Sequence, residues 1–556
     1  MIMTQIGTFQ PYHLQWSERS LPLADYVPGV HSTEDIFFKL AENRCVDWVV
    51  SRTCDHAHGK LILCDQGRAA RCPLHGWELD TATLTYRNIG VTKKTIPFRQ
   101  EEERLIYSAE RSALELPDAL RSEAPVEVTV RFLAHACLVI DIAGKRLAMD
   151  PWLIGPCFSN GWWHTVPPKS EALDLVREAD LIYISHNHPD HMHAETLSHL
   201  RRNVPIIVPD FPTNSTVRPL RRMGFTHVMP LEFNRIYAVH NTPIYLSILQ
   251  AGDFRDDSGL YLSAGRFSLL STVDSNCLNN FVLPHAVDLL TTSFASGASG
   301  FPLCFEMFTE EERFQIVKRN RRAYALHAVQ YVETVAPRVY MPYAGYFTEA
   351  APRDVFIRDH NIKNTSQSII KEVRVAAPHV KTVDPMQTDL IRFAPDGQVT
   401  TDVVPGVPLY HVTEAYVRAY IAAYKAQAAE FDSRVIRDYF LASSFRDKLV
   451  VYLVPTDDDF KSAAEHEGVR VDFRAEHVLA ETHPSHVLLN EFAGTEPDGY
   501  RLLLIKARMD SLWHVVTNRL PLEELSIGFQ CRIDRKPNVY NAAFWYHFTN
   551  VYTGAG

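Results

Sequence analysis

The stretch LIYISHNHPDH, residues 181–191, decides the fold of this chain, because a strand-sized apolar run leads directly into a dense group of metal-binding side chains. His186 and His188 alternate along an extended loop, so both point the same way and suit one metal ion. Asp190 and His191 turn toward a second position. A single histidine is more often a surface or core residue, but four such side chains within six residues after a strand predict a metal site.

The pattern H-x-H-x-D-H after an apolar strand resembles the metal loop of the metallo-β-lactamase superfamily. Strand patterns alternate with helical patterns from about residue 125 to residue 400, which indicates a layered α/β arrangement. We therefore expect a central α/β (αββα) metallo-β-lactamase-like domain over residues 125–400. The segment PDGQVTTDVVPGVP, residues 395–408, is rich in proline and glycine and favours a boundary. Residues 405–556 begin with a long helical pattern and end in strands, which predicts a C-terminal α+β domain.

Two carboxylates further along the chain are candidate metal ligands. Asp274 follows the apolar strand FSLLSTV, where the superfamily usually places its metal-bridging aspartate. Asp253 lies in QAGDFRDDSG, and together with His186 and His188 it would complete the two-histidine, one-carboxylate triad of non-haem iron oxygenases. The alternative is that the aspartates of this stretch form only a solvated acidic turn. His135, in LAHACLVID, is expected to support the site rather than to bind metal.

Two Cys-His pairs near the N-terminus predict an iron–sulfur cluster. Cys54-Asp55-His56 and Cys72-Pro73-Leu74-His75 form the pattern C-x-H…C-x-x-H, with 15 residues between His56 and Cys72. A Rieske [2Fe–2S] centre needs this set, with two thiolates on one iron and two imidazoles on the other. A Cys₂His₂ zinc site is the alternative, but such sites usually pair C-x-x-C with H-x₃₋₅-H. Short β-like runs surround the motif, so residues 1–115 are predicted to form an all-β Rieske domain.

Composition narrows the class of protein. A chain of 556 residues is too long for one core, which makes a multidomain protein the expectation. The net charge of −10, with no basic block to offset it, argues against a nucleic-acid partner. The longest apolar runs are strand-sized, and the start MIMTQIGTFQPYHLQW lacks a basic segment followed by an apolar one, so neither a membrane span nor a signal peptide is expected. Nine cysteines without a regular framework fit a reducing, cytoplasmic location.

At this point the chain resembles one family, the cytidine monophosphate-N-acetylneuraminate hydroxylases. The likeness is spread along nearly the whole chain, which makes it more specific than the metal loop alone. The matching segments are the Cys54/His56/Cys72/His75 cluster motif, HAC (135–137), DPWLIGPCFSNGWW (150–163), LIYISHNHPDH (181–191), TVD (272–274), SGASGFP (296–302), PYAGYF (342–347), IGFQCR (527–532) and FWYHF (544–548).

This resemblance implies a Rieske-dependent non-haem iron monooxygenase with one or two catalytic irons. Its substrates would be O₂ and a nucleotide-activated sialic acid, whose N-acetyl group is hydroxylated to N-glycolyl. Its electrons would come from a ferredoxin, or from cytochrome b5 with its reductase. The cluster histidines must then approach the iron within one chain or across a homodimer. The expected metal ligands are His186, His188, Asp190, His191, Asp253 and Asp274, with His186, His188 and Asp253 as the catalytic set.

The chain departs from the family pattern close to the expected reaction centre. Asp253 stands where the family typically has histidine, Ser293 stands where aspartate is expected, and no histidine follows Tyr346. Other readings therefore stay open. One is an N-oxygenase or C-hydroxylase of a small biosynthetic intermediate on the same scaffold. Another is a metal-dependent hydrolase whose metal-bound hydroxide attacks an ester or amide. A pure electron carrier would leave the metal loop unexplained.

Overall fold

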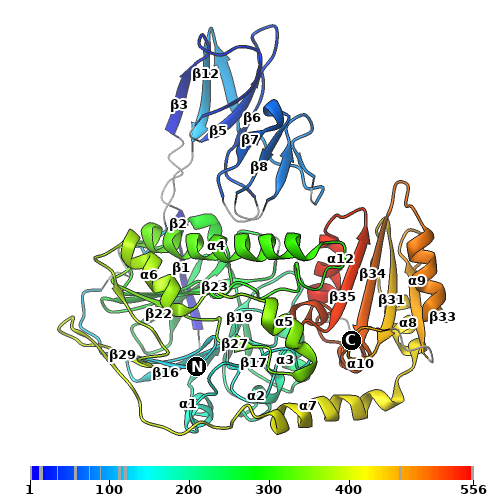
Figure 1. The fold of residues 1–556 in the computed structure, drawn as a ribbon. Helices are drawn as coiled ribbons and strands as arrows, with labels where there is room; N and C mark the ends of the chain where they lie inside the picture. The colour runs from blue at the N-terminus through cyan, green and yellow to red at the C-terminus, as the bar shows by residue number, and fades with distance from the viewer. Residues whose placement is uncertain are drawn as a thin grey trace.

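The computed structural model describes residues 3–11, 17–33, 35–55, 59–73, 76–87, 89–109, 114–117, 120, 122–253, 255–461 and 466–552. Two eight-stranded sheets form its centre (Figure 1). The first sheet contains, in spatial order, β1 (Met3–Thr8), β21 (Arg235–Val239), β22 (Ile244–Gln250), β23 (Ser258–Ala264), β24 (Phe267–Ser271), β25 (Leu289–Thr292), β26 (Val339–Pro342) and β28 (Lys381–Thr382). The second contains β20 (Val228–Leu231), β19 (Ile206–Pro209), β18 (Leu181–Tyr183), β16 (Lys145–Met149), β15 (Cys137–Ile142), β14 (Val128–Ala134), β29 (Leu390–Phe393) and β30 (Val399–Asp402).

The two sheets pack face to face, and helices cover their outer faces. Side chains such as Leu138 and Ile140 of the second sheet share one core with Leu260 and Leu262 of the first. On the outer face of the second sheet lie α1 (Ala172–Arg177), α2 (Ala194–Ser198) and α3 (Val217–Arg222). On that of the first sheet lie α4 (Glu310–Val335) and α6 (Ser366–Ala376). This helix–sheet–sheet–helix layering is the αββα arrangement that the sequence predicts.

The longest helix, α4, is well specified by its sequence. Thr309 and Glu312 form a capping box at its start, which satisfies free backbone N–H groups there. Ala336, in a left-handed conformation, ends it. No helix among the described residues is both long and apolar enough to cross a membrane.

The segment from residue 17 to residue 109, here called the N-terminal β-unit, consists of small antiparallel sheets above α4 (Figure 1). Its strands are β3 (Ser17–Pro22), β4 (Gly29–Ser32), β5 (Ile36–Leu40), β6 (Val46–Ser51), β7 (Ile62–Cys64), β8 (Ala69–Arg71), β9 (Glu78–Asp80), β10 (Thr85–Tyr86), β11 (Phe98–Glu101) and β12 (Arg104–Ala109). One of its two cores includes Ala323 of α4, so this helix closes the lower end of the unit.

The first strand, β1, does not belong to an N-terminal domain of residues 1–115, whereas the sequence predicts that it does. β1 pairs antiparallel with β21 and forms the edge of the first large sheet. β2 (Gln10–Pro11) then pairs with β13 (Leu114–Glu115), on the return from the β-unit. The physical reason is that β21 would otherwise expose an unpaired edge, which β1 covers.

The C-terminal part of the chain combines one mixed sheet with several helices. Its sheet has the order β33 (Leu479–Pro484), β32 (Glu467–Asp472), β31 (Leu449–Thr456), β34 (Arg501–Arg508) and β35 (Cys531–Lys536). The helices are α7 (Glu414–Gln427), α8 (Ser433–Leu441), α9 (Ser485–Gly494), α10 (Met509–Thr517), α11 (Glu524–Ile527) and α12 (Ala542–Tyr546). Two smaller elements of the central part are the pair β17 (Trp163–His164) and β27 (Phe347–Thr348), and the helix α5 (Val355–His360).

The backbones of the central and C-terminal parts touch at two glycines. A Cβ on Gly161 would lie 2.1 Å from the carbonyl oxygen of Gly528, and a Cβ on Gly528 would lie 2.1 Å from that of Phe158. Beside them, the indole Nε1 of Trp162 donates to the carbonyl of Ile527 at 3.0 Å. Because no side chain fits in this contact, glycine is required on both sides.

We expect Gly161→Ala to lower the midpoint of thermal unfolding, because the new methyl group meets backbone atoms that cannot move aside. Overpacking of this kind costs about 1–3 kcal/mol, and more where the clash is with backbone. Gly494→Ala is the matched control, since a Cβ there meets nothing within 4 Å. Differential scanning calorimetry of the two variants measures the effect, and equal midpoints would contradict the close contact.

Candidate metal centre

The metal loop leaves the second sheet at the carboxyl end of β18. This strand lies between the parallel strands β16 and β19, and all three of its side chains are buried. Loops at the carboxyl ends of neighbouring parallel strands meet at one edge of the sheet. The loop after β16 and the loop after β18 therefore lie side by side, and together they supply the buried polar groups of the site.

One group of candidate ligands contains His186, His188 and Asp257. One ligand atom from each lies within 4.8 Å of the others. Nε2 of His186 is 2.9 Å from Nδ1 of His188 and 3.7 Å from Oδ1 of Asp257. Burial raises the pKa of Asp257 to about 6, against the lowering effect of the Arg255 guanidinium. Two imidazoles and a buried carboxylate facing one another form a donor set that fits a divalent cation.

The second group surrounds His191. Its Nε2 lies 3.3 Å from a carboxylate oxygen of Asp190 and 3.3 Å from one of Asp274. This nitrogen is buried and makes no hydrogen bond with the described residues, so it is available to a metal ion. His135 Nε2 lies 3.0 Å from the Asp190 carboxylate, and His135, Asp190 and His191 form a further group of candidate ligands. Burial lowers the pKa of His191, but Asp190, Asp274 and Asp150 raise it well above its usual value, because negative charge is in excess here.

Asp150 orients the His191 ring through Nδ1, the ring nitrogen that does not face Asp190 and Asp274. The sequence pattern did not predict a role for Asp150. Its carboxylate lies 3.0 Å from Nδ1 of His191 and accepts hydrogen bonds from the backbone N–H and the hydroxyl of Ser185, each at 2.8 Å. A carboxylate on Nδ1 fixes the tautomer that leaves Nε2 free for a metal. The available signal was its place directly after the apolar strand KRLAM, at the start of DPWLIG.

Asp253, which the sequence favoured as the triad carboxylate, is placed differently from Asp257. Its carboxylate is 2.7 Å from Nη2 and 3.0 Å from Nε of Arg255. Among the described residues it belongs to none of the candidate ligand groups. Asp256 accepts a hydrogen bond from the Tyr546 hydroxyl at 3.0 Å. The acidic turn therefore is more than a solvated loop, and its last aspartate is the one beside His186.

The predicted cluster motif is described only in part. Cys54 and Cys72 are buried in one core of the N-terminal β-unit, whereas His56 and His75 lie outside the described residues. The backbone N–H of Cys54 donates to the Gly59 carbonyl at 2.8 Å, and that of Cys72 to the Trp77 carbonyl at 2.7 Å. These backbone hydrogen bonds fix the positions of both cysteines in the same core of the unit.

Helix α4 contacts both the cysteine loops and the metal centre. A Cβ on Gly76 would lie 2.8 Å from Nη1 of Arg319, so the guanidinium packs directly on the loop after Cys72. One turn along α4, Ala323 is buried in the same core as both cysteines. Burial raises the pKa of the next residue, Tyr324, to about 12, with Arg255 lowering it and the Asp274 and Asp257 carboxylates raising it. Tyr324 is therefore within electrostatic range of these charged groups.

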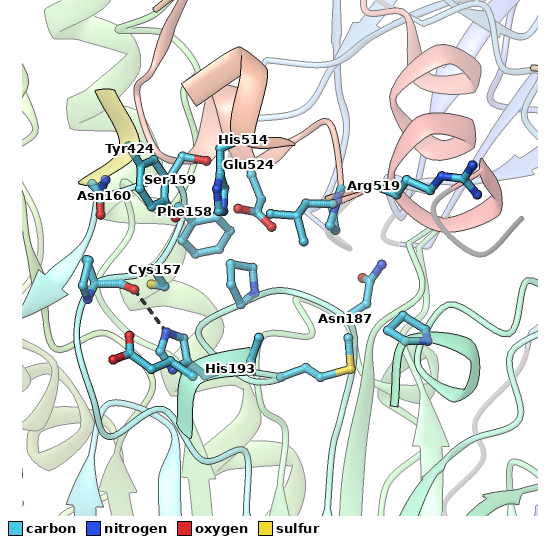
Figure 2. A pocket seen from close by; sticks show the side chains of 18 of the residues that line it. Cys157, Phe158, Ser159, Asn160, Asn187, His193, Tyr424, His514, Arg519 and Glu524 are labelled. Atoms are coloured by element: carbon cyan, nitrogen blue, oxygen red, sulfur yellow. Dashed lines mark hydrogen bonds between the residues drawn. The ribbon is translucent and has the colours of Figure 1, made fainter. Parts of the chain in front are cut away.

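The C-terminal part of the chain also contacts the metal loop. The Asn187 side chain donates to the Thr549 carbonyl at 2.9 Å, and His188 Nε2 lies 4.0 Å from the Glu523 carboxylate. Next to this contact lies a pocket of about 320 Å³, lined by residues of the metal loop, of α3 and of the C-terminal part (Figure 2). Burial, and then the charge of Asp190, raise the pKa of Glu524 in this pocket to about 8.

Comparison with known proteins gives one domain and one family. A family profile described as "Beta-lactamase superfamily domain" matches residues 129–244, within the region expected to have this fold. Cytidine monophosphate-N-acetylneuraminic acid hydroxylase of Danio rerio is 31% identical over 532 residues, which cover 89% of this chain and 86% of that protein. The enzymes of the same name from Pongo pygmaeus and Mus musculus are 32% and 31% identical over the same share of this chain, and cover 86% and 88% of their own lengths.

Similar solved structures share only part of the architecture. The diiron β-hydroxylase CmlA of Streptomyces venezuelae aligns with 47% of this chain at 18% identity and a TM-score of 0.32. A putative metal-dependent hydrolase from Parabacteroides distasonis aligns with 48% at 13% identity and a TM-score of 0.30. Such weak likenesses distinguish no activity from another.

We expect Asp257→Asn to lower the affinity for the catalytic metal more than tenfold, because a neutral amide replaces a carboxylate that faces His186. Loss of even an indirect metal contact costs roughly 10–100-fold in affinity. Asp253→Asn is the control and should keep its metal, since the carboxylate of Asp253 faces Arg255. Elemental analysis of the two variants after dialysis is the measurement. The reverse outcome would favour Asp253 as the ligand.

Proposed function

The chain belongs to the cytidine monophosphate-N-acetylneuraminic acid hydroxylase family, and we propose that it is a Rieske-dependent non-haem iron monooxygenase acting on the N-acetyl group of a CMP-activated sialic acid. The single observation that carries the proposal is the set of ligand atoms from His186, His188 and Asp257, with that of His191 beside it. It stands in a chain that is 31% identical to a hydroxylase of this name over 89% of its length.

The proposed ligands of the first iron are His186, His188 and Asp257. Two neutral imidazoles and one carboxylate leave an Fe²⁺ site with one net positive charge and with positions for substrate and O₂. Asp190, His191 and Asp274 would hold a second iron, with Asp274 between the two groups because it is near both His186 and His191. Buried ligand atoms without hydrogen bonds, Asp190 Oδ1 and His191 Nε2, support a cation at this place.

When bound, iron supplies the oxidising power that inserts one atom of O₂ into the C–H bond of the N-acetyl methyl group, while two electrons and two protons convert the other atom to water. The protein's own residues prepare that site. Asp150 holds the His191 ring in one orientation, and His135 holds Asp190. Much of the site is shielded from water, since His186, Asp190 and Asp257 are each at most 2% exposed, while the side chains of His188 and Asp274 are 15% and 25% exposed. Burial of this kind protects a reactive site from side reactions.

The electrons are proposed to enter through a Rieske cluster held by Cys54, His56, Cys72 and His75. An external ferredoxin, or cytochrome b5 with its reductase, would reduce it. The buried position of both cysteines and their tight loops fit the thiolate side of such a cluster. Helix α4, which touches the loop after Cys72 through Arg319 and the carbonyl of Ser275, next to Asp274, through Tyr331, is the proposed route between the two centres.

The direct test is product formation by the full chain, supplied with a reduced electron donor, O₂ and CMP-N-acetylneuraminic acid. We expect a product heavier by one oxygen atom that derives from labelled O₂, together with the rhombic EPR signal of a reduced Rieske centre. Cys72→Ser should abolish both the signal and the product. Stoichiometric zinc without that signal, or hydrolysis of the sugar nucleotide in place of oxygen insertion, would refute the proposal.

We expect Arg319→Gln to lower the midpoint potential of the cluster, because removal of a positive charge near Cys72 disfavours an added electron. The shift should be on the order of tens of millivolts, since the guanidinium is partly buried and screening is incomplete. Arg322→Gln, on the same helix, is the control, since this arginine pairs with Glu372 and is largely exposed. A redox titration followed by EPR compares them. Equal potentials would show that the Arg319 charge does not act on the cluster.

A further inference from the structure

The pocket beside the metal loop is lined on one side by two polar side chains, Asn160 and Ser159, that make no side-chain hydrogen bond with the described residues. Asn160 is 1% exposed and lines the pocket, and neither its Nδ2 nor its Oδ1 makes a hydrogen bond with the described residues. A buried amide without partners is unfavourable, because its desolvation is not compensated. Ser159 and Glu524 lie next to each other on the same wall. A ligand that offers both donors and acceptors in one plane would satisfy this wall.

Aromatic rings form a second wall. Phe158 lines the pocket, and its ring lies 5.8 Å from that of His188, so the pocket borders the metal loop. The stacked rings of Tyr424 and His514, 4.0 Å apart, complete this wall from the C-terminal part. Most of the remaining lining is apolar. Rings of this kind accept a flat heterocycle by stacking.

Positive charge gathers on the far side. Arg222 of α3 and Arg519, after α10, both line the pocket, and Asn160 and Arg519 lie on opposite sides of it in Figure 2. Burial, and then the charges of Arg519 and Arg218, lower the pKa of Arg222, so the arginines are close enough to repel one another. Arg222 makes no ion pair with any described carboxylate. The lining contains two acidic residues, Glu195, which accepts a hydrogen bond from the Tyr420 hydroxyl at 3.0 Å, and Glu524, whose pKa burial raises to about 8. An anion between the arginines would relieve the repulsion.

We infer that this pocket binds the cytidine monophosphate part of the substrate, with the base against Asn160 and Phe158 and the phosphate at Arg222 and Arg519. This inference rests on the proposed function, from which the nucleotide comes. The volume of about 320 Å³ suits a pyrimidine nucleotide, and small-molecule sites generally begin near this size. Asn187 and Pro189 of the metal loop form part of the lining, so a sugar attached to the phosphate has the reaction centre as its neighbour.

Calorimetric titration of the full chain with cytidine monophosphate tests the pocket separately from the reaction. Arg222→Gln and Arg519→Gln should each weaken binding about tenfold, as expected for loss of one charged hydrogen-bond partner. Asn160→Gly keeps the left-handed backbone of this position and removes the amide, and it should weaken binding to a similar extent. The matched control is Arg418→Gln, an exposed arginine on α7 that pairs with Glu414 and does not line the pocket.

Steady-state kinetics with the intact sugar nucleotide give the second readout. The arginine variants should raise KM about tenfold and leave kcat nearly unchanged, because these side chains bind the nucleotide and not the reacting group. If the double variant Arg222→Gln/Arg519→Gln binds cytidine monophosphate as tightly as the wild type does, the pocket assignment is wrong. This conclusion holds even if the wild type forms the hydroxylated product. If the variants lose the nucleotide but the wild type makes no hydroxylated product, the pocket stands and the proposed reaction fails.

Discussion

The buried carboxylate of Asp150 is the contact on which the candidate metal centre depends. Asp150 directly follows β16, and its carboxylate accepts hydrogen bonds from the backbone N–H and the hydroxyl of Ser185, which follows β18. It therefore fixes the start of the metal loop against the neighbouring strand. The same carboxylate then orients His191. Burial raises the pKa of Asp150, which its partners counteract, and an unpaired carboxylate here would be strongly unfavourable. One side chain thus joins the register of the second sheet to the positions of the ligands.

Helix α4 gives the molecule a rigid connection between two kinds of chemistry. Near its middle, Arg319 and Ala323 meet the N-terminal β-unit, and Tyr324 lies within electrostatic range of Arg255 and of the Asp274 carboxylate. Further along, the Tyr331 hydroxyl donates to the carbonyl of Ser275, the residue after Asp274. A displacement of the β-unit would therefore be transmitted to the metal ligands through a single helix. That arrangement suits the proposed electron transfer from the cluster to the metal centre, which depends on a fixed separation.

The sequence predicted the parts of the site that are dense in local signal. The metal loop could be predicted because an apolar strand and its polar loop are adjacent in the chain. The match to the β-lactamase superfamily profile confirms the fold around it. The choice between Asp253 and Asp257 could not be made from the sequence, since the two are four residues apart in one acidic stretch. Both lie near Arg255, and only the fold shows that Asp257 is the one beside His186. Asp150 was missed because its function exists only once β16 and β18 pair. The place of β1 likewise depends on an edge strand more than two hundred residues away.

The hydrogen bond from Asn187 to Thr549 joins residues that are 362 positions apart. A ribosome adds about 5–20 residues each second, so the metal loop is made roughly 20–70 s before its cover exists. During that interval the histidines and carboxylates of the loop face the surrounding solution, and an ion can reach them without passing through finished protein. Closure then comes last, with the final helical turns. Because of the order of synthesis, an ion can reach this centre before the C-terminal part covers the metal loop.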